Sequence, residues 1–186
     1  DGLATRLREG EATIGIIGLG YVGLPLAVAF IEAGFGVRGF DIDRHRVDRL
    51  LDADSYVDDI NDERLATALE SGFEPSTDPA IIADCDAYVI AVPTGMADQE
   101  PDMSAVEAAS ETVAAQSGSR ETLVVVSSTV YPGATTDVVG PIIRANREYS
   151  THLAMVPERI NPGGEYEFGD IPLVIGANTD DARDAA

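Results

Sequence analysis

The chain has 186 residues, 45% of them hydrophobic, a length that suits one substantial core or one domain with the start of a second. Its 33 acidic residues against 12 basic ones, all arginine, give a formal net charge of −21, which argues against nucleic acid and anionic membranes as partners. No apolar run reaches the roughly 18 residues of a membrane span, no secretory signal is visible and Cys85 is the sole cysteine, so we expect a cytoplasmic protein without an internal disulfide.

Hydrophobic periodicity and turn residues predict short strands that alternate with helices along the chain. Strands are expected at 13–17, 37–40, 73–76, 88–92, 123–126, 153–156 and 173–175. Helical segments are expected at 3–9, 21–33, 44–51, 63–70, 79–84, 104–115 and 135–143, and Thr179 is expected to cap the start of one more. This alternation predicts an α/β fold with a doubly wound, mostly parallel, Rossmann-like sheet and helices on both faces.

Three glycines follow the first strand in the pattern G-x-G-x-x-G, at Gly18, Gly20 and Gly23. Gly18 would permit a tight turn, Gly20 would let the backbone approach a pyrophosphate, and Gly23 would let helix and strand pack closely. The free N–H groups of the first helical turn would then face the phosphates, aided by the helix dipole. The pattern alone is weak, but the strand before it and the helix after it predict a dinucleotide site.

Asp41 ends the second strand, 18 residues beyond Gly23, where a carboxylate can accept hydrogen bonds from the ribose hydroxyls of an adenosine. The alternative is an aspartate that only caps the loop. Asp41 also favours NAD over NADP because it would repel a 2′-phosphate, although Arg44 and Arg46 lie close enough to receive one. We expect Arg46 to pack near the adenosine while Asp41 dominates the choice.

Polar residues also follow the later strands, at the edge where ligands bind in open parallel sheets. They lie in Val92-Pro93-Thr94, in Ser127 to Gly133, in Pro157-Glu158-Arg159 and in the loop that runs on from Asn161. Together they predict hydroxyls, a carboxylate and a guanidinium around one crevice, which suits the ordering of a water and a polar substrate. The alternatives are turn and cap roles for Thr94 and Thr129 and a salt bridge for Glu158.

Cys85 precedes an apolar strand and stands between Asp84 and Asp86, whose charges would disfavour a thiolate. We therefore expect a buried packing residue rather than a nucleophile. His45 and His152 have no spacing typical of a metal site or a catalytic triad, and no metal site is predicted.

The acidic residues are spread along the chain rather than gathered in one tail, for example at Asp58-Asp59, Asp62-Glu63 and Asp180-Asp181. This spread indicates a solvated acidic surface over a normal core. Together with the absence of lysine, it suggests a halophilic protein adapted to high salt. Self-repulsion should weaken such a fold at low ionic strength.

Several stretches carry a specific family resemblance, namely "IGIIGLGYVGLPLA", "GFDIDRHRV", "CDAYVIAVPT", "EPDMSAV", "SSTVYPGATT" and "VPERINPG". In combination they resemble the N-terminal domain of the UDP-glucose/GDP-mannose dehydrogenase family, over nearly the whole chain. The leading helix, "SGFEPSTD", "EPDMS" and "TVYPG" look most similar to the branch that acts on UDP-N-acetylhexosamines. Gly95 and Ser127 depart from the proline and the glutamate usual in the family.

The resemblance implies oxidation of a nucleotide sugar's C6 alcohol to a carboxylate with two NAD, through a thiohemiacetal and a thioester on a cysteine. It implies cofactor contacts at Gly18, Tyr21, Val22, Gly23, Asp41, Arg46, Thr94 and Thr129. Thr129 and Glu158 would order and activate the water, with Glu158 the candidate acid/base. In the family the nucleophilic cysteine, an active-site lysine and most uridine contacts lie further along the chain, so these 186 residues alone are expected to bind NAD without turnover.

The first residue is not methionine, which suggests a fragment of a longer protein. Residues 1–178 would then form the NAD-binding domain with its leading helix, and 179–186 would start the linker helix to a substrate domain that carries the catalytic cysteine. The resemblance further implies a homodimer for the full-length protein and a role in surface polysaccharide or glycan synthesis.

Two other readings stay open at this point. The amino-terminal domain of a β-hydroxyacid dehydrogenase would explain the glycine motif but not "VPERINPG". A non-catalytic domain that senses dinucleotides would explain the motif as well, but it would need neither Thr129 nor Glu158 at the crevice.

Overall fold

The computed structural model describes residues 2–97, 100–145, 150–157 and 172–186. The strands are β1 (Thr13–Ile17), β2 (Gly36–Phe40), β3 (Phe73–Ser76), β4 (Ala87–Ile90), β5 (Gly95–Ala97), β6 (Glu100–Asp102), β7 (Thr122–Val126), β8 (Thr151–Met155) and β9 (Gly176–Ala177). The helices are α1 (Leu3–Glu9), α2 (Gly23–Glu32), α3 (Arg44–Leu51), α4 (Asp62–Glu70), the 3₁₀-helix η1 (Pro79–Ile82), α5 (Ser104–Gln116), the π-helix η2 (Thr135–Val139), α6 (Gly140–Arg144) and α7 (Asp180–Ala185). The predicted alternation of strands and helices is confirmed.

Three features differ from the sequence expectations. The helix expected at 135–143 opens as η2 and continues as α6. The strand expected at 173–175 is wrong, because the strand that pairs with β8 begins at Gly176 and runs antiparallel to it. The hairpin of β5 and β6 was not predicted, since strands of three residues are too short to show an alternating pattern.

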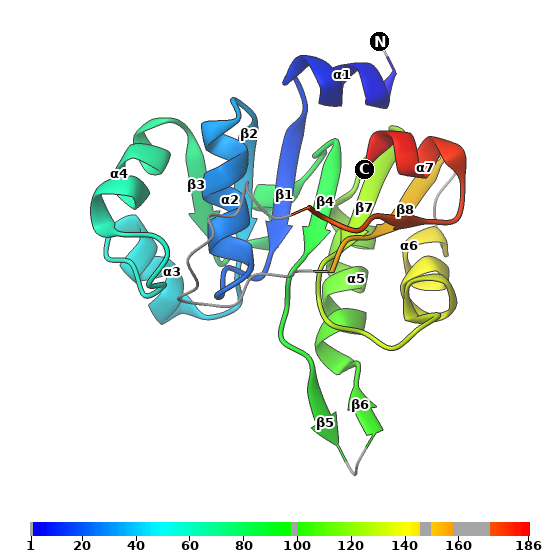
Figure 1. The fold of residues 1–186 in the computed structure, drawn as a ribbon. Helices are drawn as coiled ribbons and strands as arrows, with labels where there is room; N and C mark the ends of the chain where they lie inside the picture. Colours follow the sequence, from blue (N-terminus) through cyan, green and yellow to red (C-terminus); the bar gives the residue numbers. More distant parts are fainter. Residues whose placement is uncertain (1, 98–99, 146–149, 158–171) are drawn as a thin grey trace.

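The main sheet of the described part of the chain has seven strands in the order β3-β2-β1-β4-β7-β8-β9, and only β9 runs antiparallel to its neighbour. The strand order reverses between β1 and β4, which is the point where open α/β sheets bind ligands. Figure 1 shows the carboxyl ends of the parallel strands at one edge, with the β5–β6 hairpin projecting beyond it and α1 at the opposite end.

Two apolar cores cover the two faces of the sheet, as the nearly continuous apolar strands require. On β7, Leu123 packs into the core that contains α2 and α4, whereas Val124 and Val126 pack into the core that contains α5 and α6. This alternation follows from the period of two along a strand. The two cores leave the carboxyl edge as the place where loops are free to bind a ligand.

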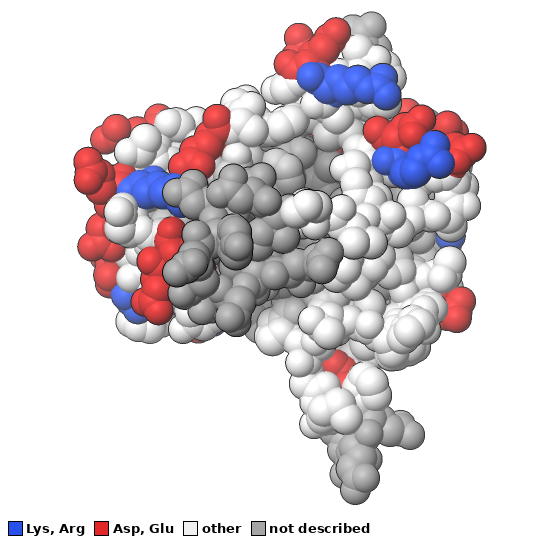
Figure 2. Space-filling view, in the orientation of Figure 1, with Lys and Arg blue, Asp and Glu red and all other residues white. Residues whose placement is uncertain are grey.

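Apart from the buried Asp41 and Asp86, the charged side chains of the described residues lie at least partly exposed on this fold. Figure 2 shows acidic side chains over the region of α3 and α4 and near α1 and α7, each group with arginine beside it. One such pair is Glu32 and Arg64, whose Oε1 and Nε atoms lie 2.6 Å apart with both side chains well exposed. None of the helices in the described ranges combines the length and the apolar character that a membrane span requires.

Asp86 joins the leading helix to the amino end of the sheet. Its side chain is almost fully buried; Oδ2 accepts a hydrogen bond from the Thr13 N–H at 2.9 Å. Its Oδ1 accepts from Arg6 Nε at 3.1 Å and lies 2.9 Å from Arg6 Nη2. A buried carboxylate with this many donors holds α1 onto β1 and β4.

We expect Asp86→Ala to lower the free energy of unfolding by about 3 kcal/mol, because it leaves the partly buried Thr13 N–H and the Arg6 guanidinium without this acceptor. Urea unfolding in molar KCl measures the change. The matched control is Glu32→Ala, which breaks an exposed ion pair of similar length and should cost less than about 1 kcal/mol. Equal small losses in both variants would show that Asp86 does not hold the helix.

Candidate functional site

A cavity of about 570 Å³ lies at the carboxyl edge, where the strand order reverses. It is lined by the loop after β1, the end of β2, the segment after β4 and one side of α5. This volume is in the range of small-molecule and cofactor sites. The lining residues are Ile17, Gly18, Gly20, Tyr21, Val22, Phe40, Asp41, Ile42, Asp43, Arg46, Ala91, Val92, Pro93, Ala105, Ala108, Ala109 and Thr112.

Two of the three motif glycines are required by close packing in this structure, and the third borders open space. Gly18 has φ of +90°, and a Cβ there would lie 2.6 Å from the Ala91 carbonyl oxygen. A Cβ on Gly23 would lie 1.8 Å from the Gly18 carbonyl oxygen, so helix α2 can approach the strand only without a side chain. A Cβ on Gly20 would meet nothing within 4 Å. Gly20 therefore leaves its side of the cavity open for a ligand.

Asp41 is 4% exposed and accepts three hydrogen bonds at the end of β2. Oδ2 accepts from the Leu19 N–H at 2.8 Å and from Arg46 Nη1 at 2.9 Å, and Oδ1 accepts from the Asp43 N–H at 2.9 Å. Asp41 thus does cap the loop, as the alternative interpretation required. A carboxylate has about four acceptor sites, so one is left for a ribose hydroxyl without displacing any donor.

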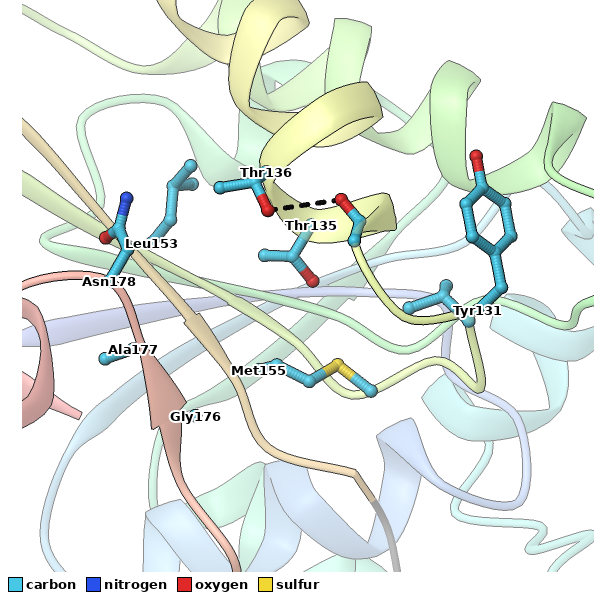
Figure 3. A pocket seen from close by; sticks show the side chains of 10 residues that line it. Tyr131, Thr135, Thr136, Leu153, Met155, Gly176, Ala177 and Asn178 are labelled. Carbon is cyan, nitrogen blue, oxygen red and sulfur yellow. Dashed lines mark hydrogen bonds between the residues drawn. The ribbon is translucent and has the colours of Figure 1, made fainter.

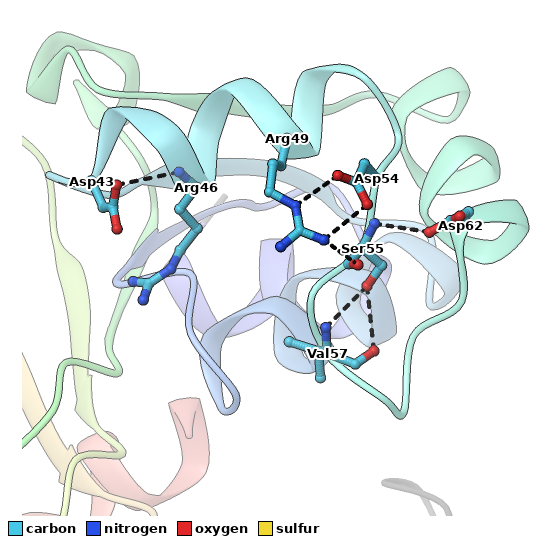
Figure 4. A network of polar contacts seen from close by, with 7 residues as sticks. All are labelled: Asp43, Arg46, Arg49, Asp54, Ser55, Val57 and Asp62. Atoms are coloured by element: carbon cyan, nitrogen blue, oxygen red, sulfur yellow. Dashed lines mark hydrogen bonds and ion pairs between the residues drawn. The ribbon is translucent and has the colours of Figure 1, made fainter.

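Arg46 pairs directly with Asp41 and also faces the ring of Tyr56, whose centroid lies 5.5 Å from the guanidinium carbon. Tyr56 comes from the turn after α3, which Arg49 holds by hydrogen bonds to both carboxylate oxygens of Asp54 and to the Ser55 carbonyl (Figure 4). The Tyr56 hydroxyl donates to the Leu19 carbonyl inside the glycine loop. Sequence reasoning missed Tyr56, because no local pattern links it to that loop.

The side of α5 that lines the cavity was also missed. Its lining residues are Ala105, Ala108, Ala109 and Thr112. They follow the i, i+3, i+4, i+7 spacing of one helix face, so this face could have been recognised as a run of small residues that leaves room beside it.

The two threonines expected at the crevice are not among the residues that line this cavity. Thr94 is half-buried and directly follows Pro93, the last residue after β4 that lines the cavity. Thr129 is exposed and lies after β7. Ser128 ties the two segments together, because its Oγ donates to the Val92 carbonyl at 2.8 Å. Glu158, Arg159 and the loop from Asn161 lie outside the described residues.

A second, smaller cavity of about 290 Å³ lies beside the carboxyl end of β8 (Figure 3). Its wall includes Tyr131, Thr135 and Thr136 from the segment after β7 and Met155 from β8. The Thr136 hydroxyl donates to the Gly133 carbonyl at 3.2 Å, which closes the turn before η2. The residues after β7 therefore border a space of their own rather than the larger cavity.

Cys85 is buried, and burial raises the pKa of its thiol to about 11. It packs under Gly15, away from the carboxyl edge, so it does not serve as a nucleophile there. The predicted packing role of Cys85 is consistent with its burial and with the raised pKa of its thiol.

His152 lies 2.7 Å from the Glu121 carboxylate, and this contact lowers the pKa of Glu121.

A sequence model of the NAD binding domain of the UDP-glucose/GDP-mannose dehydrogenase family matches residues 12–186. The chain belongs to this family. It is 38% identical over 177 residues to a UDP-N-acetyl-D-glucosamine 6-dehydrogenase from Salmonella typhi, and the alignment covers 91% of this chain and 40% of that protein. It is 36% identical over 163 residues to a UDP-N-acetyl-D-mannosamine dehydrogenase from the same organism, covering 81% and 38%.

Among solved structures, a UDP-glucose dehydrogenase from the archaeon Pyrobaculum islandicum superposes with a TM-score of 0.84 at 32% identity, covering 94% of this chain and 43% of that one. The chain thus spans about two fifths of the length of these relatives. Within this family it is the NAD-binding domain, and NAD is the cofactor.

The residues at the carboxyl edge fit that cofactor. The cavity combines an open backbone at Gly20, a helix start at Gly23 without a side-chain cap, and a buried carboxylate at Asp41 with one acceptor site to spare. These are the features that a pyrophosphate and an adenosine ribose require. Gly20, Asp41 and Val22, the residue just before Gly23, line the same cavity.

Proposed function

We propose that this chain is the NAD-binding half of a nucleotide-sugar 6-dehydrogenase that oxidises the C6 alcohol of a UDP-sugar, a UDP-N-acetylhexosamine or UDP-glucose, to the uronic acid. The main support is the cavity at the strand reversal, where the glycines and Asp41 fit a dinucleotide. The chain's membership in this family agrees with that fit. The relatives named for UDP-N-acetylglucosamine and UDP-N-acetylmannosamine support the substrate class.

In this proposal the residues of the larger cavity would hold two NAD molecules in turn, and each would accept one of the two hydrides released when the alcohol is oxidised to the acid. Gly18, Gly20, Tyr21, Val22 and Gly23 bind the pyrophosphate, the last three around the start of α2. Asp41 accepts from the adenosine ribose, with Arg46 beside it, and Thr94 and Thr129 bind the cofactor where the segments after β4 and β7 meet.

We expect Asp41→Asn to weaken NAD binding about tenfold and to bring NADP affinity close to that of NAD. The amide keeps the shape of the side chain but loses the charge that repels a 2′-phosphate, and that charge also strengthens the ribose hydrogen bond. Calorimetric titration of both dinucleotides in molar KCl measures the two affinities. An unchanged ratio of NAD to NADP affinity would remove Asp41 as the selecting residue.

Glu158 and Thr129 are proposed to order and activate the water that yields the acid, with Glu158 as the acid/base. In the complete enzyme, Glu158→Gln should therefore slow acid formation by at least about a hundredfold while NAD affinity stays near that of the unchanged protein. Rapid-mixing kinetics and calorimetry read the two effects separately. A parallel loss of both would assign Glu158 a structural role.

The remaining proposals concern the protein as a whole. Residues 1–178 form the NAD-binding domain, and 179–186 begin a linker helix towards a substrate domain that carries the nucleophilic cysteine. The complete protein is a cytoplasmic, salt-adapted homodimer. Its product, a sugar acid, serves surface polysaccharide synthesis. Assay of the complete protein against UDP-glucose, UDP-N-acetylglucosamine and UDP-N-acetylmannosamine, followed by NADH absorbance, tests the activity. Activity with none of the three sugars would refute the proposed reaction.

A further inference from the structure

Tyr56 contacts both halves of the proposed cofactor site, although it lies outside the glycine motif and is not among the residues that line the larger cavity. Its hydroxyl reaches the Leu19 carbonyl, 37 positions away in the sequence, and its ring faces two guanidinium groups. Asp41 is the other side chain of the described residues that contacts both the glycine loop and Arg46. The position of Tyr56 therefore matters for both parts of the site.

The contact with Leu19 controls the direction of one peptide group. In a planar trans peptide the carbonyl and the following N–H point in opposite directions. Because the Leu19 carbonyl is held towards Tyr56, the Gly20 N–H points away from Tyr56. The Leu19 N–H donates to Asp41 Oδ2, and the Leu19 side chain is fully buried. The loop at Leu19 is thus held on both sides, and the peptide before Gly20 cannot rotate freely.

The contact of the Tyr56 ring with Arg46 restricts the position of the Arg46 side chain. The guanidinium carbons of Arg46 and Arg49 lie 5.5 Å and 5.4 Å from the Tyr56 ring centroid, within the range of cation–π attraction. Arg49 is fixed by its hydrogen bonds to Asp54 and Ser55 (Figure 4). Its guanidinium therefore offers the Tyr56 ring a fixed partner. Arg46 lies between that ring and Asp41, and both contacts oppose a turn of its guanidinium outward toward a further anion.

Burial raises the pKa of the Tyr56 hydroxyl well above its ordinary value. The group therefore stays protonated, and remains a donor to the Leu19 carbonyl, at every pH that suits the folded protein.

We propose that Tyr56 is a positioning residue that sets both the affinity for NAD, through the peptide before Gly20, and the preference for NAD over NADP, through the restraint on Arg46. This inference rests on the proposed function of the larger cavity as the NAD site. It predicts that the hydroxyl and the ring have separable effects. Removal of the hydroxyl should weaken both dinucleotides equally, whereas removal of the ring should also release Arg46 to bind a 2′-phosphate.

The test compares Tyr56→Phe and Tyr56→Leu by calorimetric titration of NAD and NADP in molar KCl, with unfolding midpoints recorded for each variant. Tyr56→Phe should weaken both dinucleotides about three- to tenfold, the worth of one hydrogen bond, with their ratio unchanged. Tyr56→Leu should in addition narrow the ratio of NAD to NADP affinity by about fivefold, because the cation–π contact is lost. If Tyr56→Leu fails to fold, Tyr56→Phe still tests the effect on the loop.

The matched control is Phe35→Leu, which also removes a half-buried ring packed against the same core, but one whose ring contact is with Phe30 and which has no hydroxyl to donate to the glycine loop. It should lower the unfolding midpoint and leave both affinities unchanged. Wild-type affinities in both Tyr56 variants would overturn the inference, as would a loss in Tyr56→Leu that leaves the NAD to NADP ratio unchanged. Failure of the wild-type protein to bind NAD at all would instead refute the proposed function.

Discussion

Raising KCl from about 0.1 M to about 3 M is expected to raise the unfolding midpoint of this protein by on the order of 10 °C. With a formal net charge of −21 and acidic residues spread over the chain, repulsion between carboxylates lowers the stability of the folded state. The Debye length falls from about 10 Å at 0.1 M to about 3 Å at 1 M, so most of this repulsion is screened in molar salt. Circular dichroism melts at graded KCl concentrations measure the shift.

A charge variant serves as the control for this salt effect. Asp58→Asn with Asp59→Asn removes two exposed carboxylates that lie side by side, and it should raise the midpoint in low salt more than in molar salt. Sucrose at equal osmolality separates screening from general exclusion of solute from the surface. A midpoint that does not rise between low and molar KCl would refute adaptation to salt.

Gly23→Ala and Gly20→Ala are expected to differ sharply in their effect on stability, although both add one methyl group to the same motif. A Cβ on Gly23 would lie 1.8 Å from the Gly18 carbonyl oxygen, so we expect a loss of more than about 3 kcal/mol of folding free energy or no folded protein. A Cβ on Gly20 would meet nothing within 4 Å, so stability should change by less than about 1 kcal/mol. Urea unfolding in molar KCl compares the two variants.

NAD affinity completes this comparison. Gly20→Ala places its methyl group on the open side of the cavity, where the proposed pyrophosphate approaches the backbone, and should weaken NAD binding by at least about tenfold. Gly2→Ala is the control, since a Cβ there also meets nothing within 4 Å but lies outside the cavity. If Gly20→Ala binds NAD as the wild type does, the pyrophosphate does not lie against Gly20.

Segments with strong local signals were predicted closely. The helix at Arg44–Leu51 and the strand at Phe73–Ser76 have the bounds that periodicity and flanking residues indicate, and Thr179 caps α7 by accepting from the Ala182 N–H at 3.1 Å. The strand expected at 173–175 was misplaced, because strand formation there depends on pairing with Met155 rather than on the apolar residues themselves. Local propensity thus predicts elements, but pairing decides where a short edge strand begins.

The sequence by itself determined the parallel α/β order, the family and the glycines and Asp41 of the candidate site, because each depends on residue types at fixed spacing along the chain. Only the tertiary structure decided that Asp41 is already bound to Leu19 and Arg46, that Thr94 and Thr129 lie outside the larger cavity, and that Tyr56 holds the glycine loop. These are contacts between segments that are distant in sequence or between side chains with several partners available. Which of these contacts form depends on how the packed elements bring donors and acceptors together, and no local sequence pattern indicates that.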